Sequence, residues 1–203
     1  MGAQSNEGDT TVMTAQPAPY AARLTIDYPT QELDRLTTFF RLIWVIPIAI
    51  ISSLISNTLW VAAALMIAAR QRYPRWWFDF SLELTRFNTR IGIYMALLTD
   101  QYPSTVEEQA LHLDVDYPDV QRDLNRWLPL FKWLLALPHY VVLVFVWLAV
   151  IVAVVVAWFA ILFTGRYPRS LFDFVVGAFR WTQRVNAYAF LLVTDVYPPF
   201  SLS

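Results

Sequence analysis

The chain has 203 residues, a formal net charge of −1 and no cysteine. The lack of cysteine excludes disulfides, thiolate metal sites and cysteine nucleophiles, and the near-neutral charge argues against a nucleic-acid partner. Hydrophobic residues make up 57% of the chain and the mean hydropathy is +0.43, whereas an ordinary soluble domain is roughly 45–50% apolar. The composition therefore indicates a membrane protein.

The chain begins with a polar segment, residues 1–19, that is rich in Gly, Ser, Thr, Gln and Pro. This composition predicts a disordered tail, and the segment lacks the basic start and apolar core of a secretory signal. The next segment, "RLTIDYP", alternates apolar and polar residues before a Tyr-Pro pair that favours extended backbone. We therefore expect a short strand that enters the first helix.

The segment "RLTTFFRLIW" mixes arginine with aromatic residues, which suits a stub helix lying at the level of lipid headgroups. No charged residue occurs from Leu42 to Ala69, and about 20 apolar residues suffice to cross a bilayer. Proline disfavours helix before it, so Pro47 predicts a break between the stub and a span over residues 48–69. A single helix kinked at Pro47 is the alternative.

After the span comes the loop "RQRYPRWW", which places arginines beside tryptophans. Arginine holds phosphate through paired donors, and tryptophan favours the membrane interface. The candidate residues for contact with lipid or a partner in this loop are Arg72, Arg75, Trp76 and Trp77. A plain turn between helices, in which Arg75 pairs with Asp79, is the alternative.

The following segment places its polar residues at helical spacing, with an aliphatic back. The stripe consists of Asp79, Arg86, Arg90 and Tyr94. It predicts an amphipathic helix whose charged side either stays wet at the membrane surface or faces the inside of a helix bundle.

Every one of these elements occurs twice. The second copy has "LDVDYP", the stub "RWLPLFKWLL" ending before Pro138, an apolar span over residues 139–163, and "RYPRSLFDF" with Arg166 and Arg169 as the candidate contacts. Its stripe consists of Asp173, Arg180, Arg184 and Tyr188. The sequence thus predicts membrane repeats over residues 20–104 and 113–203, joined by a polar connector, 105–112.

The repeats predict an all-α membrane protein of two helical hairpins, with about four membrane-embedded or interfacial helices and short stub helices. The two strands, where formed, pair with each other or with a partner's sheet. The two repeats share the same short sequence segments, so we expect each segment to lie in the same surroundings in both copies. This requires that each repeat crosses the bilayer zero or two times. We expect two crossings about a pseudo-twofold axis near the membrane normal, with both termini cytoplasmic; a flat amphipathic helix with one crossing per repeat is the rival.

The words "LTIDYP", "FKWLLALPHYVVL" and "ILFTGRYPRSLFDFVVGAFRWTQRVNAYAFLLVTDVYPPFSL", with their counterparts in the first copy, resemble the bacterial membrane family catalogued as domain of unknown function number 4389. The resemblance covers nearly the whole chain after about Tyr20 and is looser in the first copy. It implies a multi-pass protein of the bacterial inner membrane, and it carries no catalytic residues over.

Few side chains of the sequence could bind a metal or a cofactor. The two histidines, His112 and His139, do not recur between the copies, and an isolated histidine makes no metal site. The acidic residues around the connector lack the register of a calcium loop and indicate a solvated linker. We therefore expect no metal and no cofactor.

Three functions remain open. The first is a non-catalytic accessory or assembly subunit that contacts lipids and other integral membrane proteins of a larger complex. The second is a component of a transporter or channel, with the Asp/Arg/Tyr stripes lining a polar path. The third is a lipid-acting enzyme with Asp79 or Asp173 as a base, for which no nucleophile or metal cluster is present. The sequence favours the first, and hence no enzymatic activity.

Overall fold

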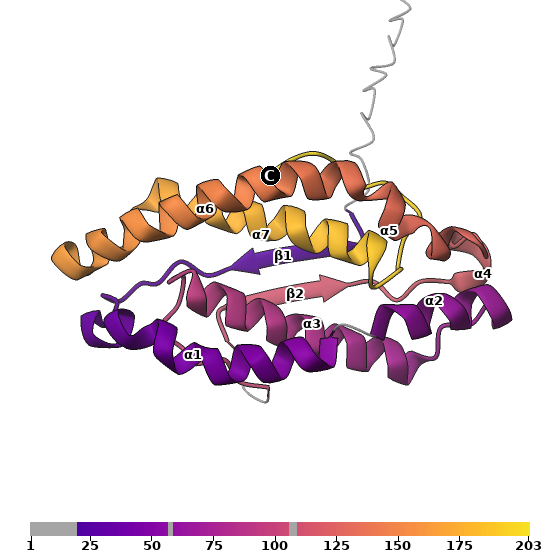
Figure 1. The fold of residues 1–203 in the computed structure, drawn as a ribbon, viewed down its shortest axis with the longest axis horizontal. Helices are drawn as coiled ribbons and strands as arrows, with labels where there is room; N and C mark the ends of the chain where they lie inside the picture. The colour runs from indigo at the N-terminus through magenta and orange to yellow at the C-terminus, as the bar shows by residue number, and fades with distance from the viewer. Residues whose placement is uncertain (1–19, 57–58, 106–108) are drawn as a thin grey trace, which may run out of the picture.

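The computed structural model describes residues 20–56, 59–105 and 109–203, so the predicted disordered tail lies outside the described residues. A pair of strands runs through the centre of the described part, with helices along both sides (Figure 1). Most of the rest is helical, as the sequence predicts.

The two strands are β1, Ala22–Ile26, and β2, Leu111–Val115. They form one antiparallel pair in which Leu24 lies opposite Leu113. In both strands buried and exposed residues alternate, as expected when one face of a sheet packs on a core and the other faces solvent. Of the two predicted partners for these strands, the structure shows that they pair with each other.

The register of this pair reveals a pseudo-twofold relation. The words "LTIDYP" and "LDVDYP" make Leu24 the counterpart of Leu113, and these two residues face each other in the sheet. The pair Ala22 and Val115 has as its counterpart the pair Ile26 and Leu111. Exchanging the two repeats therefore maps the strand pair onto itself, and the axis passes through its centre, perpendicular to the strands.

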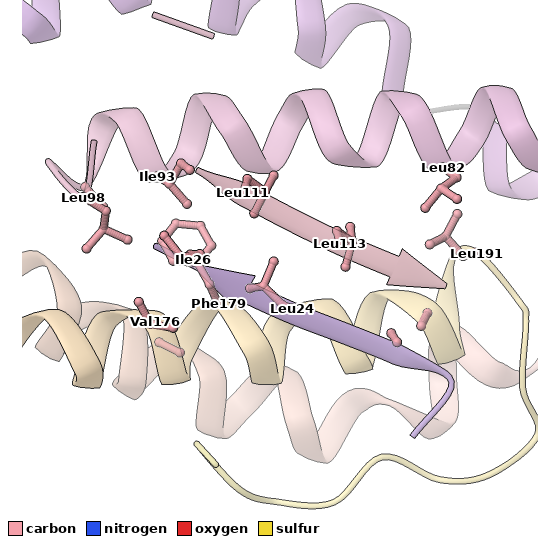
Figure 2. Close-up of a cluster of buried hydrophobic side chains, with 14 of the residues drawn as sticks. Leu24, Ile26, Leu82, Ile93, Leu98, Leu111, Leu113, Val176, Phe179 and Leu191 are labelled. Atoms are coloured by element: carbon pink, nitrogen blue, oxygen red, sulfur yellow. The ribbon is translucent and has the colours of Figure 1, made fainter. Parts of the chain in front are cut away.

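The two predicted stripe helices are α3, Arg75–Met95, and α7, Arg169–Ala189, each 21 residues long. Each starts directly after a proline, Pro74 or Pro168, whose fixed φ and missing N–H suit a helix start. The strands lie between these helices, and leucine and isoleucine side chains of the strands pack against both (Figure 2). The largest buried cluster of the described residues lies here.

The strands are exchanged between the repeats. The hydroxyl of Tyr28, just after β1, donates to the Tyr167 carbonyl before α7 at 2.6 Å, whereas Tyr20, before β1, reaches the Arg184 carbonyl near the end of α7 at 3.3 Å. β1 of the first repeat thus runs antiparallel to α7 of the second. By the same pattern β2 runs along α3, so α3 and α7 are antiparallel to each other.

In the first repeat the apolar segment forms two helices, α1, Arg35–Ser56, and α2, Leu59–Arg70. Pro47 lies inside α1, so the predicted break at this proline is wrong and the alternative of one helix through it is correct. The neighbours of a proline can satisfy the freed carbonyl. The predicted span over residues 48–69 covers the end of α1 and nearly all of α2, and residues 57–58 between them lie outside the described residues.

In the second repeat the stub is separate. The short helices α4, Val120–Asp123, η1, Leu128–Leu130, and α5, Lys132–Leu135, precede α6, Leu137–Thr164. Pro138 lies in the first turn of α6, where a proline is tolerated. Gly165 ends the helix in a left-handed conformation with φ of 72°, which glycine adopts without strain.

Among the described residues, α6 alone is long and apolar enough to cross a membrane. It runs antiparallel to α7, since residues 165–168 join the two helices and Trp181 in the second half of α7 donates its indole N–H to His139 near the start of α6. Of the four membrane crossings that the sequence predicts, length and composition therefore support one within the described residues.

Candidate functional site

The stripe arginines close the two edges of the strand pair. Asp27 N–H donates to the Ala110 carbonyl and Asp116 N–H to the Ala21 carbonyl. Because hydrogen-bonded positions alternate in an antiparallel pair, the carbonyls of the central pair point outward to the free edges.

These two outward carbonyls each accept a hydrogen bond from an arginine. Arg86 Nε in α3 donates to the Leu113 carbonyl at 2.9 Å, and Arg180 Nε in α7 donates to the Leu24 carbonyl at 3.0 Å. An uncovered edge is a template for pairing with another chain. The arginines thus occupy positions that a partner's strand would need.

The outer face of the strand pair is charged. Arg23 binds Asp116 through two hydrogen bonds of 3.0 and 2.9 Å, and His112 lies 3.2 Å from Asp27. Arg23 and His112 are counterparts, as are the two aspartates, so each of these two side chains contacts the aspartate of the other repeat. Asp114 adds a further carboxylate that is 71% exposed.

The repeated "RYPR" words hold the other repeat's Asp-Tyr-Pro segment. The Arg169 guanidinium lies 4.5 Å from the centre of the Tyr28 ring, and Phe172 meets the same ring edge-on at 4.8 Å. Cation–π contacts and edge-to-face aromatic pairs of this kind are attractive. Together with the bond from the Tyr28 hydroxyl to the Tyr167 carbonyl, they form what we call the first tyrosine grip.

The second tyrosine grip is its counterpart. Arg75 lies 4.6 Å from the centre of the Tyr117 ring, Phe78 meets that ring at 5.1 Å, and the Tyr117 hydroxyl donates to the Tyr73 carbonyl. The repeated words therefore have a structural use: each repeat grips the tyrosine of the other.

The predicted ion pair within each loop forms in one repeat. Arg169 lies 3.2 Å from Asp173, whereas no ion pair joins Arg75 to Asp79 in the part of the chain that the structure describes. Among the other candidate contact residues, Trp77 is partly buried against the main core, while Arg72, Arg166 and Trp76 are exposed, Trp76 by 66%. Contact of these exposed side chains with lipid or a partner stays a prediction.

The remaining stripe residues tie each helix to the loop that follows it. Arg90 donates to the Ser104 carbonyl at 2.6 Å, and Arg184 donates to the Ser201 carbonyl at 2.6 Å. Tyr94 and Tyr188 are buried, and each lies next to a cation from the stub of its own repeat. The arginines and tyrosines of the predicted stripe are therefore structural anchors within the protein.

Those stub cations, Arg41 and Lys132, were not among the predicted site residues. Lys132 is fully buried, lies 2.7 Å from Asp195 and donates to the Thr194 carbonyl at 2.8 Å. Burial lowers the pKa of Lys132, and Asp195 opposes that shift. The signal that points to this pair is a cation in each stub together with a Thr-Asp in each final loop.

Arg41 makes the equivalent contacts in the first repeat. It pairs with Asp100 and donates to the carbonyls of Thr99 and Tyr94 at 2.9 and 3.2 Å. A buried cation is costly unless it is paired and hydrogen-bonded. Each repeat therefore fastens its stub to its stripe helix through one satisfied buried cation.

A cavity of about 300 Å³ lies between α2, α3 and α7. Its polar lining is uncharged and includes Thr85, Thr89 and Gln183, where Gln183 donates to the Thr89 hydroxyl at 2.8 Å. Tyr73 also lines it, and burial raises the pKa of this tyrosine. None of the charged stripe residues lines the cavity.

The described residues contain no group of three or more His, Asp or Glu side chains placed to hold a metal ion. His139 is fully buried, accepts from the Trp181 indole at 3.1 Å and stacks on Phe200 at 3.9 Å. These contacts identify His139 as a packed core side chain.

The outermost surface of α6 is apolar along its length. Its buried side packs toward α7 and the main core, and the opposite side exposes large aliphatic and aromatic side chains. The exposed set on α6 includes Val141, Val144, Phe145, Leu148, Ile151, Val152, Val155, Val156, Phe159 and Phe163. Helices α1 and α2 expose further apolar side chains, including Phe39, Ile46, Ile50, Val61 and Leu65.

Comparison with known proteins gives one match. The family described as "Domain of unknown function (DUF4389)" matches residues 35–107 and again residues 126–201. Neither a curated protein nor a solved structure matches the chain. The two matched segments together exceed half of the chain, and each contains the long helices of one repeat but neither strand. The chain belongs to the DUF4389 family and carries its domain twice.

Proposed function

We propose that this protein is a non-catalytic membrane component that acts as an accessory or assembly subunit, contacting lipids and other integral proteins of the cell membrane. The observation that carries the proposal is the exposed apolar side of α6. No charged residue occurs from Trp133 to Gly165, and only 22% of the most apolar stretch of α6 is buried.

This low burial distinguishes α6 from the core helix of a soluble protein, which would be mostly covered. Monomeric soluble proteins rarely expose contiguous apolar patches larger than a few hundred Å². Lipid tails are a favourable environment for such a surface, and the exposed Trp76 and Trp127 suit the boundary between lipid and water.

A role in transport has less support. Arg86 and Arg180 bind strand carbonyls, and Arg90 and Arg184 bind loop carbonyls. The cavity between α2, α3 and α7 is lined by other side chains. The observations therefore favour an accessory role over a polar path through the protein.

Flotation with lipid vesicles tests membrane association. Val152 is exposed near the middle of α6, and an arginine placed among acyl chains is costly because its charge loses contact with water. We expect Val152→Arg to reduce the floated fraction at least about tenfold. The matched control is Thr25→Arg on the exposed face of β1, which leaves flotation unchanged. Equal flotation of wild type and Val152→Arg would contradict the proposal.

The accessory role needs a separate test. Complexes released with mild detergent are compared between wild type and a Trp76→Ala variant, with the exposed Gln121→Ala as control. We expect the same partner proteins to accompany wild type and Gln121→Ala, and to be lost selectively from Trp76→Ala. Wild-type protein that migrates as an isolated chain after such extraction would contradict a subunit role.

A further inference from the structure

We infer that the protein lies flat in one leaflet of a lipid bilayer, with α6 parallel to the membrane plane and the charged outer face of the strand pair turned to water. The inference rests on the proposed membrane function and adds the part of the membrane that the apolar surface occupies. It follows from the position of the strand pair along the axis of α6.

The strand pair lies beside the middle of α6. Arg180, near the middle of α7, binds the carbonyl of Leu24 at the centre of the strand pair. The neighbouring Phe179 meets the Trp147 ring of α6 edge-on at 5.1 Å. Trp147 lies within one helical turn of the midpoint of α6, and one turn is about 5 Å along the helix axis. The strands themselves run alongside α6 and α7 (Figure 1).

A crossing by α6 would therefore place the strand pair near the middle of the hydrocarbon. Asp27, Asp114 and Asp116 are 69%, 71% and 62% exposed on or beside the outer strand face. Open sheet edges and irregular loops do not face lipid, and intramembrane charges normally face the inside of a bundle. Lying flat keeps these carboxylates in water and still buries α6.

The pseudo-twofold relation points the same way. Its axis is perpendicular to the strands, and α6 lies along them (Figure 1). A crossing α6 would put the axis in the membrane plane and send the loops with Arg72 and Arg166 to opposite sides. A flat α6 puts the axis along the membrane normal, so that both loops lie at one depth. Matching "RYPR" words then meet matching surroundings.

The first repeat is also suited to lying flat. Helix α1 lies on the side of the strand pair opposite α6 (Figure 1), and the exposed Val61 and Leu65 of α2 extend the apolar surface of the molecule. A helix with side chains is about 10 Å across, which fits within one leaflet. The occupant of the apolar surface is therefore the acyl-chain region of a single leaflet.

Labelling from one side of a sealed vesicle tests this arrangement. The chain has no cysteine, so single cysteines can be placed at three exposed positions: Gln121 in α4, which lines a pocket together with Arg72, Thr25 on the strand face, and Arg166 just after α6. We expect all three to react with an impermeant maleimide added to the same side. Reaction of Gln121→Cys and Arg166→Cys from opposite sides would overturn the inference.

Depth measured with nitroxide labels gives an independent readout. Phe145, Val152 and Phe159 are exposed and lie on one side of α6 at intervals of seven residues. A flat helix places the three labels at equal depth, whereas a crossing helix places the central label about 10 Å deeper than the outer two. Flotation of the same variants separates the two hypotheses. Variants that float but show the deeper central label contradict the flat arrangement alone, and variants that do not float contradict membrane association itself.

Discussion

The two repeats differ most in the apolar segment that precedes the stripe helix. In the second repeat this segment is the single helix α6, which contains no charged residue. In the first repeat it comprises α1 and α2, and residues 57–58 between them lie outside the described part of the chain. The aligned stretches are "SSLISNT" from Ser52 and "LVFVWLA" from Leu143, so the second repeat has the more apolar segment.

The contacts between the repeats are much more alike. Both tyrosine grips, both arginine contacts to strand carbonyls and both stub cations occur in each half. The repeated sequence segments therefore mark contacts inside the molecule, while the segments that differ form its outer surface.

The largest difference in stability between equivalent variants of the two repeats is expected at the partners of the two stub cations, Lys132 and Arg41. Asp195→Asn removes the charged partner of the fully buried Lys132, which then keeps its hydrogen bond to the Thr194 carbonyl. Breaking a buried ion pair lowers the free energy of unfolding by about 3 kcal/mol. Asp100→Asn is expected to cost about half as much, because Arg41 keeps two carbonyl partners. Chemical unfolding in detergent measures both variants.

A compensated variant controls for this prediction. Lys132→Met combined with Asp195→Asn removes the buried charge together with its partner, and it should recover most of the loss. If Asp100→Asn is as costly as Asp195→Asn, the extra carbonyl bonds of Arg41 do not matter and the two halves are energetically alike.

An intermediate effect is expected at the tyrosine grips. Tyr28→Ala and Tyr117→Ala each remove an arginine contact, an aromatic contact and a hydrogen bond, for a loss of about 2 kcal/mol. Tyr→Phe at either position should lose only about 1 kcal/mol, since the ring contacts remain. Melting temperatures in detergent test whether the two grips are equivalent; a large inequality would break the symmetry that the contacts suggest.

The smallest difference is expected between the two loop arginines. Arg169 contacts both Tyr28 and Asp173, whereas Arg75 contacts Tyr117. An exposed ion pair is worth about 0.5 kcal/mol, so Arg169→Ala should destabilise the protein more than Arg75→Ala by about that amount. Asp173→Asn in an Arg169→Ala background should then have no further effect. An equal loss from both arginine variants would show that the ion pair contributes nothing measurable.

The sequence predicted those parts of the fold whose signals are local and repeated. The strands at the Asp-Tyr-Pro words and the helices that carry the stripes are confirmed. The break at Pro47 was wrong because α1 continues through that proline. A proline alone does not decide this point, since the helix context determines whether its lost hydrogen bond is replaced.

The partners of the charged residues were less predictable. Spacing placed Arg86 and Arg180 on helix faces, but their acceptors are carbonyls of strands in the other repeat, 27 and 156 residues away in the chain. The same holds for Tyr28 and Tyr117, which grip the opposite repeat. Periodicity within an element contains no information on which distant element it meets.

The exchange of strands has a consequence for biosynthesis. While the ribosome is producing the first repeat, β1 has neither β2 to pair with nor α7 to cover its edge, because both follow later in the chain. The nascent first repeat therefore carries an unpaired strand and exposed apolar helices, the kind of species that aggregates or recruits chaperones. Its consolidation must wait until translation has passed α7, so a slow or stalled ribosome downstream of the connector should leave the first half a substrate for quality control.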